Sequence, residues 1–180
     1  MRTPPTVTLT SPPSGAQFTA PATIALAATA SDSDGTVTKV EFFAGATKVA
    51  TATAAPYTAS WSNVAAGSYT MKAVATDNVG ATATSPAAVV SISAPAPTVT
   101  LSAPQNGATF AVGQSILVTA QASAPARSIA RVEFYADGAL ISGTNVSGAS
   151  PAINVNLSWN TATAGPHVLY AKVITADQAS

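Results

Sequence analysis

The chain contains no cysteine and few charged side chains, and each shortage excludes a class of protein. Without cysteine there can be no disulfide, no thiolate metal site and no cysteine nucleophile. Charged residues make up 8% of the 180 residues, against about 25% in ordinary domains. Seven Lys and Arg balance seven Asp and Glu, so the formal net charge is zero. A neutral chain lacks the electrostatic attraction that nucleic acid and anionic lipid require, so we expect no nucleic-acid partner.

A long apolar run and a leader peptide are also missing. No apolar run approaches the roughly 18 residues that would span a bilayer, so we expect no membrane insertion. Residues 1–5 carry one charge with no hydrophobic stretch behind it, which is not the pattern of a signal peptide. Either the chain is a piece of something longer, or it is not exported by that route. Hydrophobic residues still make up 47% of the chain, a balance that argues against disorder.

A duplicated segment dominates the sequence. Residues 5–9, with the sequence PTVTL, recur as residues 97–101, and 16 of the 39 positions are identical between residues 5–43 and 97–135. A repeat spacing of about 90 residues suits a whole small β-sandwich and is too long for a solenoid unit. We therefore expect two domains. The extra residues of the second copy, mainly within 142–150, predict a lengthened surface loop.

Both copies show the period-two alternation of half-buried β-strands. In residues 22–30 one face carries Ile and Leu, and residues 116–122 repeat the pattern. No segment has a helical stripe, so we expect less than about 5% helix. Trp61 and Trp159 are the expected large core residues. The strands expected in the first copy lie near residues 5–10, 16–20, 22–30, 37–44, 47–53, 57–62, 68–76 and 82–92.

The second copy ends before a strand that the first copy has. Residues 82–92 read as the strand that closes the first sandwich, and the residues after Asp177 offer no counterpart. A closing strand pairs with the strand before it, so residues 167–173 are expected to present unpaired backbone groups. Such an edge is an aggregation hazard and an acceptor for a donated strand. We therefore expect the second domain to be incomplete and less stable than the first.

The motifs of the first copy resemble those of a known family. Their order is PTVTLTSP, a DSDG turn at residues 32–35, VEFF at 40–43, a Pro-Tyr pair before Trp61, and ATDNVG at 75–80. This order is similar to that of the bacterial Ig-like domain. The second copy departs from it by carrying APAR at 124–127 in place of the DSDG turn.

The resemblance implies both an architecture and a setting. The implied fold is all-β, with two tandem immunoglobulin-like β-sandwiches, the second lacking its C-terminal strand. The expected divisions are a tail at 1–4, domain 1 at 5–93, a short proline-containing linker at 94–96, and domain 2 at 97–180. Domains of this family recur in large secreted or surface proteins of bacteria. The resemblance thus implies an extracellular or cell-surface location, with flanking domains of a larger polypeptide as partners.

The single histidine is the first candidate for chemistry. His167 aligns with Tyr69, which follows Gly67 by two residues at the start of a strand. A tyrosine at this place resembles the tyrosine corner, whose hydroxyl bonds to nearby backbone. We interpret His167 as filling the same half-buried position, because general-base catalysis would need a nucleophile and an orienting acid beside it.

The carboxylates are the second candidates. Glu41 and Glu133 recur because their strand recurs, and we expect them to face solvent beside Lys39 and Arg131. A glycosidase would need two acids that face each other across a cleft. The sequence predicts no catalytic residue, no cofactor and no enzyme activity.

Asp32, Asp34 and Asp77 form the sharpest local motif. The loops that carry them are expected at the same end of the first sandwich, where three carboxylates could bind calcium. The other interpretation is that Asp and Gly simply form the turns. The further acidic ligands of an EF-hand are missing, so the sequence predicts no metal site.

The exposed aromatic residues help to distinguish a carbohydrate-binding module from a spacer or adhesion module. Phe43 and Tyr135 are the only expected outward-facing aromatics, one in each domain. A carbohydrate-binding accessory module of a polysaccharide-degrading enzyme would need an exposed row of such rings. The sequence favours a non-catalytic spacer or adhesion module, whose partner could be a cell-surface glycan or protein, and leaves the carbohydrate-binding module as the alternative.

Overall fold

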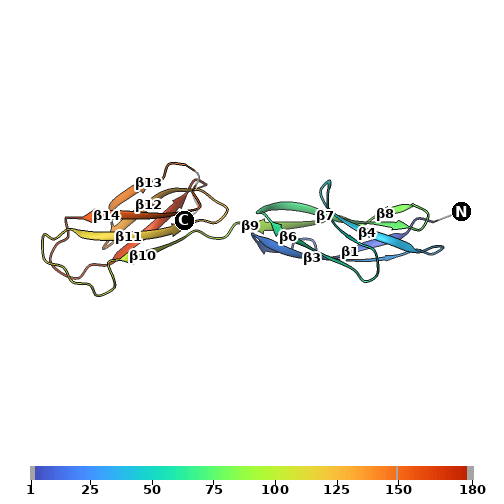
Figure 1. Ribbon diagram of the computed structural model, residues 1–180, viewed down its shortest axis with the longest axis horizontal. Helices are drawn as coiled ribbons and strands as arrows, with labels where there is room; N and C mark the ends of the chain where they lie inside the picture. Colours follow the sequence, from blue (N-terminus) through green and yellow to red (C-terminus); the bar gives the residue numbers. More distant parts are fainter. Residues whose placement is uncertain (1–2, 149, 178–180) are drawn as a thin grey trace. The chain divides into compact units, whose positions relative to one another are not determined.

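The computed structural model describes residues 3–148 and 150–177, and each element in this part of the chain is a β-strand (Figure 1). The chain divides into two compact units, Met1–Ala94 and Pro95–Ser180, here called domain 1 and domain 2. Each unit has its own apolar core, built from its own strands. The predicted all-β fold of two tandem sandwiches is therefore confirmed.

Domain 1 is a sandwich of two sheets. One sheet has the order β1-β3-β6, and the other has the order β2-β9-β7-β4-β5, with β8 paired to β7. The strands are β1 (Thr6–Ser11), β2 (Gln17–Thr19), β3 (Ala22–Ser31), β4 (Val37–Ala44), β5 (Thr47–Ala52), β6 (Tyr57–Val64), β7 (Gly67–Asp77), β8 (Thr82–Thr84) and β9 (Ala88–Ser93).

The predicted strand at 82–92 is split in two. Ser85 turns the chain inward between β8 and β9: its amide donates to the carbonyl of Ala73 over 2.8 Å, and its hydroxyl accepts from the Ala73 amide over 3.0 Å. Pro86 follows and has no N–H to continue a ladder. The prediction of one continuous closing strand was wrong, but the prediction that it pairs with the preceding strand is confirmed by the β9–β7 pairing.

Domain 2 repeats this plan with fewer strands in its described part. Its sheets have the orders β10-β11-β14 and β13-β12-β15. The insertion differs from its predicted form, because β13 continues through Asn145 and leaves only residues 146–151 to connect it to the next strand. The strands are β10 (Thr98–Ala103), β11 (Ile116–Ser123), β12 (Ile129–Ala136), β13 (Ala139–Asn145), β14 (Ala152–Trp159) and β15 (Leu169–Thr175).

The centres of the two cores use equivalent residues. Val40 and Phe42 of β4 are fully buried, and so are their counterparts Val132 and Phe134 of β12. Apolar residues at alternate positions of a strand point to one face, which is why these pairs meet the opposite sheet. The prediction for the tryptophans was half right: Trp159 is buried, but Trp61 lies at the margin of its core and is only partly buried.

Candidate functional site

His167 occupies the position of a corner tyrosine. The hydroxyl of Tyr69 donates to the carbonyl of Ala65, four residues earlier, over 3.1 Å. His167 reaches the equivalent carbonyl, that of Thr163, with Nε2 at 2.9 Å. One side chain thus replaces the other in fastening the start of the strand to the preceding loop, as the alignment predicted.

The aromatic contact of the corner is also kept. Tyr69 packs edge-to-face on Trp61, with ring centroids 5.1 Å apart and planes at 86°. His167 packs on Trp159 in the same way, at 5.2 Å and 78°. The two tryptophans are the large partners that hold these rings in place.

Asp137 is a partner of His167 that the sequence comparison missed. Its Oδ2 lies 2.6 Å from His167 Nδ1, and its Oδ1 accepts from the amide of Val168 over 2.8 Å. The hydrogen bond to Asp137 raises the pKa of His167, and the same bond lowers the pKa of Asp137. Both ring nitrogens of His167 are therefore engaged, and neither is directed at a hydroxyl that it could activate.

Glu41 and Glu133 lie on the outer faces of their strands, as predicted. Glu41 is bridged by Lys39 at 3.0 Å and by Lys48 at 2.9 Å. Hydrogen bonds from the Lys48 and Lys39 ammonium groups lower the pKa of Glu41. Ion pairs on a solvated sheet face are worth about 0–1 kcal/mol each, so this arrangement is a surface network.

In domain 2 the equivalent network is held by different donors. Arg131 Nε lies 2.9 Å from Glu133 Oε1, and the hydroxyl of Tyr135 donates to Glu133 Oε2 over 2.8 Å. The hydrogen bond from Tyr135 is the main cause that lowers the pKa of Glu133. The partners of the two glutamates in the described residues are thus Lys, Arg and Tyr side chains, whereas a glycosidase requires two acids that face each other.

The acidic loops of domain 1 meet at one end of the sandwich, as the sequence analysis expected. The amide of Thr36 donates to Asn78 Oδ1 over 3.3 Å, which links the two loops. Gly35 permits this approach, because a Cβ at its position would lie 2.5 Å from Asn78 Oδ1 and 3.0 Å from Asp32 Oδ2. An alanine at this position would require the side chain of Asn78 to move.

Each aspartate of these loops has a different local role. Asp77 is buried, and its Oδ1 accepts from the amides of Val79 and Ala81, both at 2.8 Å. Asp34 accepts from the Thr3 hydroxyl and amide, and these bonds lower its pKa. Asp32 accepts from the Asp34 amide at 3.1 Å. Within the residues described, no three His, Cys, Asp or Glu side chains gather closely enough to hold a metal ion.

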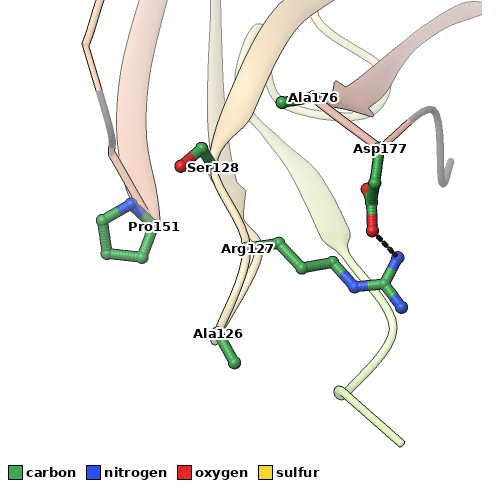
Figure 2. Close-up of a pocket in the computed structure, with 6 residues that line it drawn as sticks. All are labelled: Ala126, Arg127, Ser128, Pro151, Ala176 and Asp177. Carbon is green, nitrogen blue, oxygen red and sulfur yellow. Dashed lines mark ion pairs between the residues drawn. The ribbon is translucent and has the colours of Figure 1, made fainter. Parts of the chain in front are cut away.

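The corresponding end of domain 2 has a different chemistry. Arg127 stands where domain 1 has Gly35, and its Nη1 lies 3.2 Å from Asp177 Oδ2 (Figure 2). The pair borders an open hollow. The positive charge of Arg127 is balanced by the carboxylate of Asp177. The other residues that line the hollow are Ala126, Ser128, Pro151 and Ala176.

Two tyrosines form the one stacked aromatic pair on the described sheet faces. Tyr135 of β12 and Tyr170 of β15 are opposite each other in the strand register, with centroids 4.8 Å apart and planes at 1°. Tyr170 remains 44% exposed. Domain 1 has Phe43 and Lys72 at these positions, with the ammonium 5.7 Å from the ring.

Comparison with known protein families decides what this architecture is. A model of the bacterial Ig domain family matches residues 5–73 and again residues 97–171. The chain belongs to the bacterial Ig domain family. The two matches cover the two repeats that the sequence showed, so each unit of the structure is one bacterial Ig domain.

Solved structures resemble this tandem of bacterial Ig domains to different degrees. The fibronectin(III)-like modules of CbhA from Clostridium thermocellum are 34% identical, with 97% of this chain and 88% of that chain covered and a TM-score of 0.47. Carbohydrate-binding modules from the β-sandwich superfamily are 14% identical, with 95% and 84% covered and a TM-score of 0.42. None of the curated proteins compared with the chain matches it.

The part of the chain that the structure describes holds no helix long and apolar enough to cross a bilayer.

Proposed function

We propose that the chain is a non-catalytic structural module, a spacer or adhesive segment, of a larger secreted or cell-surface bacterial protein. Its partners would be the flanking domains of that protein. The observation that carries this proposal is the way in which domain 1 pairs its second strand, β2, with its last strand, β9.

The two ends of the domain 1 segment lie at opposite ends of its sandwich. The chain enters beside β1 and leaves after β9, at the opposite end of this domain (Figure 1). The longest strand, β7, has 11 residues, which corresponds to about 36 Å at the usual rise for each residue. A folded domain would therefore separate its neighbours by a fixed length.

The parallel pairing of β2 with the last strand, β9, is expected to resist extension of this domain. Strands β2 and β9 run parallel, with Phe18 opposite Ile92. Besides the ladder itself, three backbone hydrogen bonds join these segments: Gly15 to Val89 at 2.7 Å, Ser91 to Ala16 at 3.0 Å, and Ala20 to Ser93 at 2.9 Å. A pull on the two ends loads parallel neighbours in shear, so these bonds must break together.

The candidate side chains support a structural role. His167 fastens a loop, Glu41 and Glu133 belong to surface ion-pair networks, and Asp77 caps a turn. Each of these four side chains thus has a partner that explains its presence without a substrate.

Single-molecule force spectroscopy on the full chain tests the mechanical role. We expect a discrete unfolding peak for domain 1, and we expect Ser91→Pro to lower its force because proline removes the amide that bonds to Ala16. Forced unfolding reports the unfolding rate and not the equilibrium stability. The matched control is Ser91→Ala, which keeps the amide. Extension of domain 1 without a discrete peak would contradict the proposal.

A second candidate function rests on the tyrosine pair. Tyr135 and Tyr170 could contact the apolar face of a sugar ring, as in a carbohydrate-binding accessory module. Their mutual stacking at 4.8 Å uses one face of each ring, so only the outer faces are open to a ligand. A glycan screen of the full chain tests this function. A glycan that binds the wild type and loses affinity with Tyr170→Ala supports it, and a screen without binding rejects it.

A further inference from the structure

Two side chains at the corner of domain 2 differ from their counterparts in domain 1, and they contact each other. His167 stands at the place of Tyr69. Asp137 stands at the place of Gly45. The backbone at this second position has a φ of 60° in domain 1 and 51° in domain 2. Its amide donates to the residue after the corner side chain, over 2.8 Å and 2.9 Å respectively. The exchanges thus alter the side chains of the corner and keep its backbone.

His167 lies between two groups that can only accept hydrogen bonds. Its Nδ1 is 2.6 Å from Asp137 Oδ2, and its Nε2 is 2.9 Å from the carbonyl oxygen of Thr163. The hydrogen bond from His167 lowers the pKa of Asp137, so its carboxyl group is ionised near neutral pH. A carboxylate and a backbone carbonyl have no proton to donate. Both contacts are therefore hydrogen bonds only when the imidazole carries a proton on each nitrogen.

Loss of one proton from His167 must remove one of the two contacts. A hydrogen bond to a carboxylate is stronger than one to a neutral carbonyl, so the remaining proton should stay on Nδ1 beside Asp137. Nε2 would then direct a lone pair at the carbonyl of Thr163, and two acceptors cannot form a hydrogen bond. Residues 160–166 would lose their tie to the ring.

The corner of domain 1 has no such dependence on a proton. The hydroxyl of Tyr69 donates to the carbonyl of Ala65 over 3.1 Å. A tyrosine hydroxyl donates this bond without carrying a charge, so the bond does not depend on a titration of the ring near neutral pH. The same fastening is therefore permanent in domain 1 and conditional in domain 2.

The elements around His167 contribute one charged side chain. Asp137 comes from the turn between β12 and β13, whereas β14 and residues 160–166 contain no Asp, Glu, Lys or Arg. Strand β14 contributes the ring of Trp159, whose centroid is 5.2 Å from that of His167. The hydrogen bond to Asp137 is the main cause that raises the pKa of His167. The second proton should therefore be lost above the usual histidine pKa of about 6.5.

We propose that His167 and Asp137 form a pH-dependent switch, which holds residues 160–166 of domain 2 while the imidazole carries both protons and releases them when Nε2 loses its proton. The proton passes to water, so the step needs no other reactant. The strands of domain 2 stay in place, and the change is confined to the loop between β14 and β15. The switch would make domain 2, and not domain 1, responsive to the pH of its surroundings.

Nitrogen-15 NMR of the imidazole in the full chain tests the protonation step, because His167 is the single histidine. The spectrum distinguishes a ring nitrogen that carries a proton from one that carries a lone pair. We expect protons on both nitrogens at about pH 5.5, and a proton on Nδ1 alone at about pH 9. A neutral ring that keeps its proton on Nε2 would overturn the proposal, because the bond to Thr163 would then survive.

Backbone relaxation of Thr163 tests the release of the loop. We expect its order parameter to fall from about 0.85 at low pH to below about 0.6 at high pH, while that of Ala65 in domain 1 stays constant. His167→Tyr should keep the loop ordered at both pH values. Asp137→Asn, which tolerates the positive φ, should move the fall to lower pH. An order parameter of Thr163 that does not change with pH, the same fall in His167→Tyr, or an unshifted fall in Asp137→Asn would each overturn the proposal.

Discussion

The two domains differ at two places: the corner that holds Tyr69 or His167, and the edge of β7 or β15 on which domain 1 places β9. At the corner, His167 stands in the place of Tyr69. The side chain differs, but it bonds to the equivalent backbone carbonyl and packs on the equivalent tryptophan. At the edge, the residues of β15 remain apolar while the strand that covers their counterparts in domain 1 has no equivalent in the described part. A single substitution is absorbed locally, whereas at the edge Leu169 and Ala171 are less buried than their counterparts Met71 and Ala73.

The largest effect is expected from opening either core. Phe42 and Phe134 are equivalent and almost fully buried, at 0% and 1% exposure. We expect Phe42→Ala to lower the free energy of unfolding of domain 1 by about 3–5 kcal/mol, because the cavity adds to the lost transfer energy. Phe134→Ala should act on domain 2 alone. Chemical denaturation of each variant measures the effect. If each substitution weakens both domains equally, the cores are not independent.

A smaller effect is expected from supplying the covering strand. A copy of residues 81–93 joined after residue 180 should raise the free energy of unfolding of domain 2 by about 2–4 kcal/mol, because two or three apolar side chains would be buried. Thermal unfolding of the extended and original chains compares the two. The control extension carries aspartate in place of Val90 and Ile92. Equal stabilisation by both extensions would show that the added strand does not pair as β9 does.

The corner should make the two domains respond differently to pH. Asp137 raises the pKa of His167, so the protonated ring contributes stability that is fully present below the unfolded pKa of about 6.5. This contribution is lost as the pH rises through the folded pKa. We expect the melting temperature of domain 2 to fall by a small amount as the pH rises from about 6 to about 8. His167→Tyr, which restores the residue of domain 1, should abolish this fall. A fall that persists in the variant must come from another group.

The smallest effect concerns calcium at the acidic loops. Asp77 already accepts two amide hydrogen bonds, and Asp34 accepts from Thr3. We therefore expect millimolar calcium to leave the melting temperature of domain 1 unchanged. Domain 2 lacks the motif and serves as the internal control. A calcium-dependent rise confined to domain 1 would reveal a site and reopen the interpretation of Asp32, Asp34 and Asp77 as ligands.

The strands could be predicted because local pattern determines them. Alternation in residues 22–30 and the repeat of Val40-Glu41-Phe42 as Val132-Glu133-Phe134 are visible in the sequence alone. The corner role of His167 followed from its alignment with Tyr69. The break in the closing strand did not follow, because it depends on hydrogen bonds between Ser85 and a residue of a neighbouring strand.

Two side-chain contacts could not be predicted from the sequence, and for the same reason. In the sequence, Asp137 beside Gly138 indicates only a hairpin turn, and Asp137 does occupy a turn, with φ at 51° beside Gly138 at 85°. Its contact with His167 and the stacking of Tyr170 on Tyr135 depend on the register between β12 and β15. That register could have been transferred from the β4–β7 pairing only after domain 1 was known. Pairing between distant segments is the information that a pattern along one strand lacks.

Amide exchange of the free chain compares the two edges most directly. Ala73 and Ala171 are equivalent, but the Ala73 amide is hydrogen-bonded to Ser85, and the Ala171 amide faces the open edge of β15. We expect the Ala171 amide to exchange at least about tenfold faster than the Ala73 amide under conditions where both domains are folded. Equal protection of the two amides would contradict the account, because it would mean that β15 is already covered.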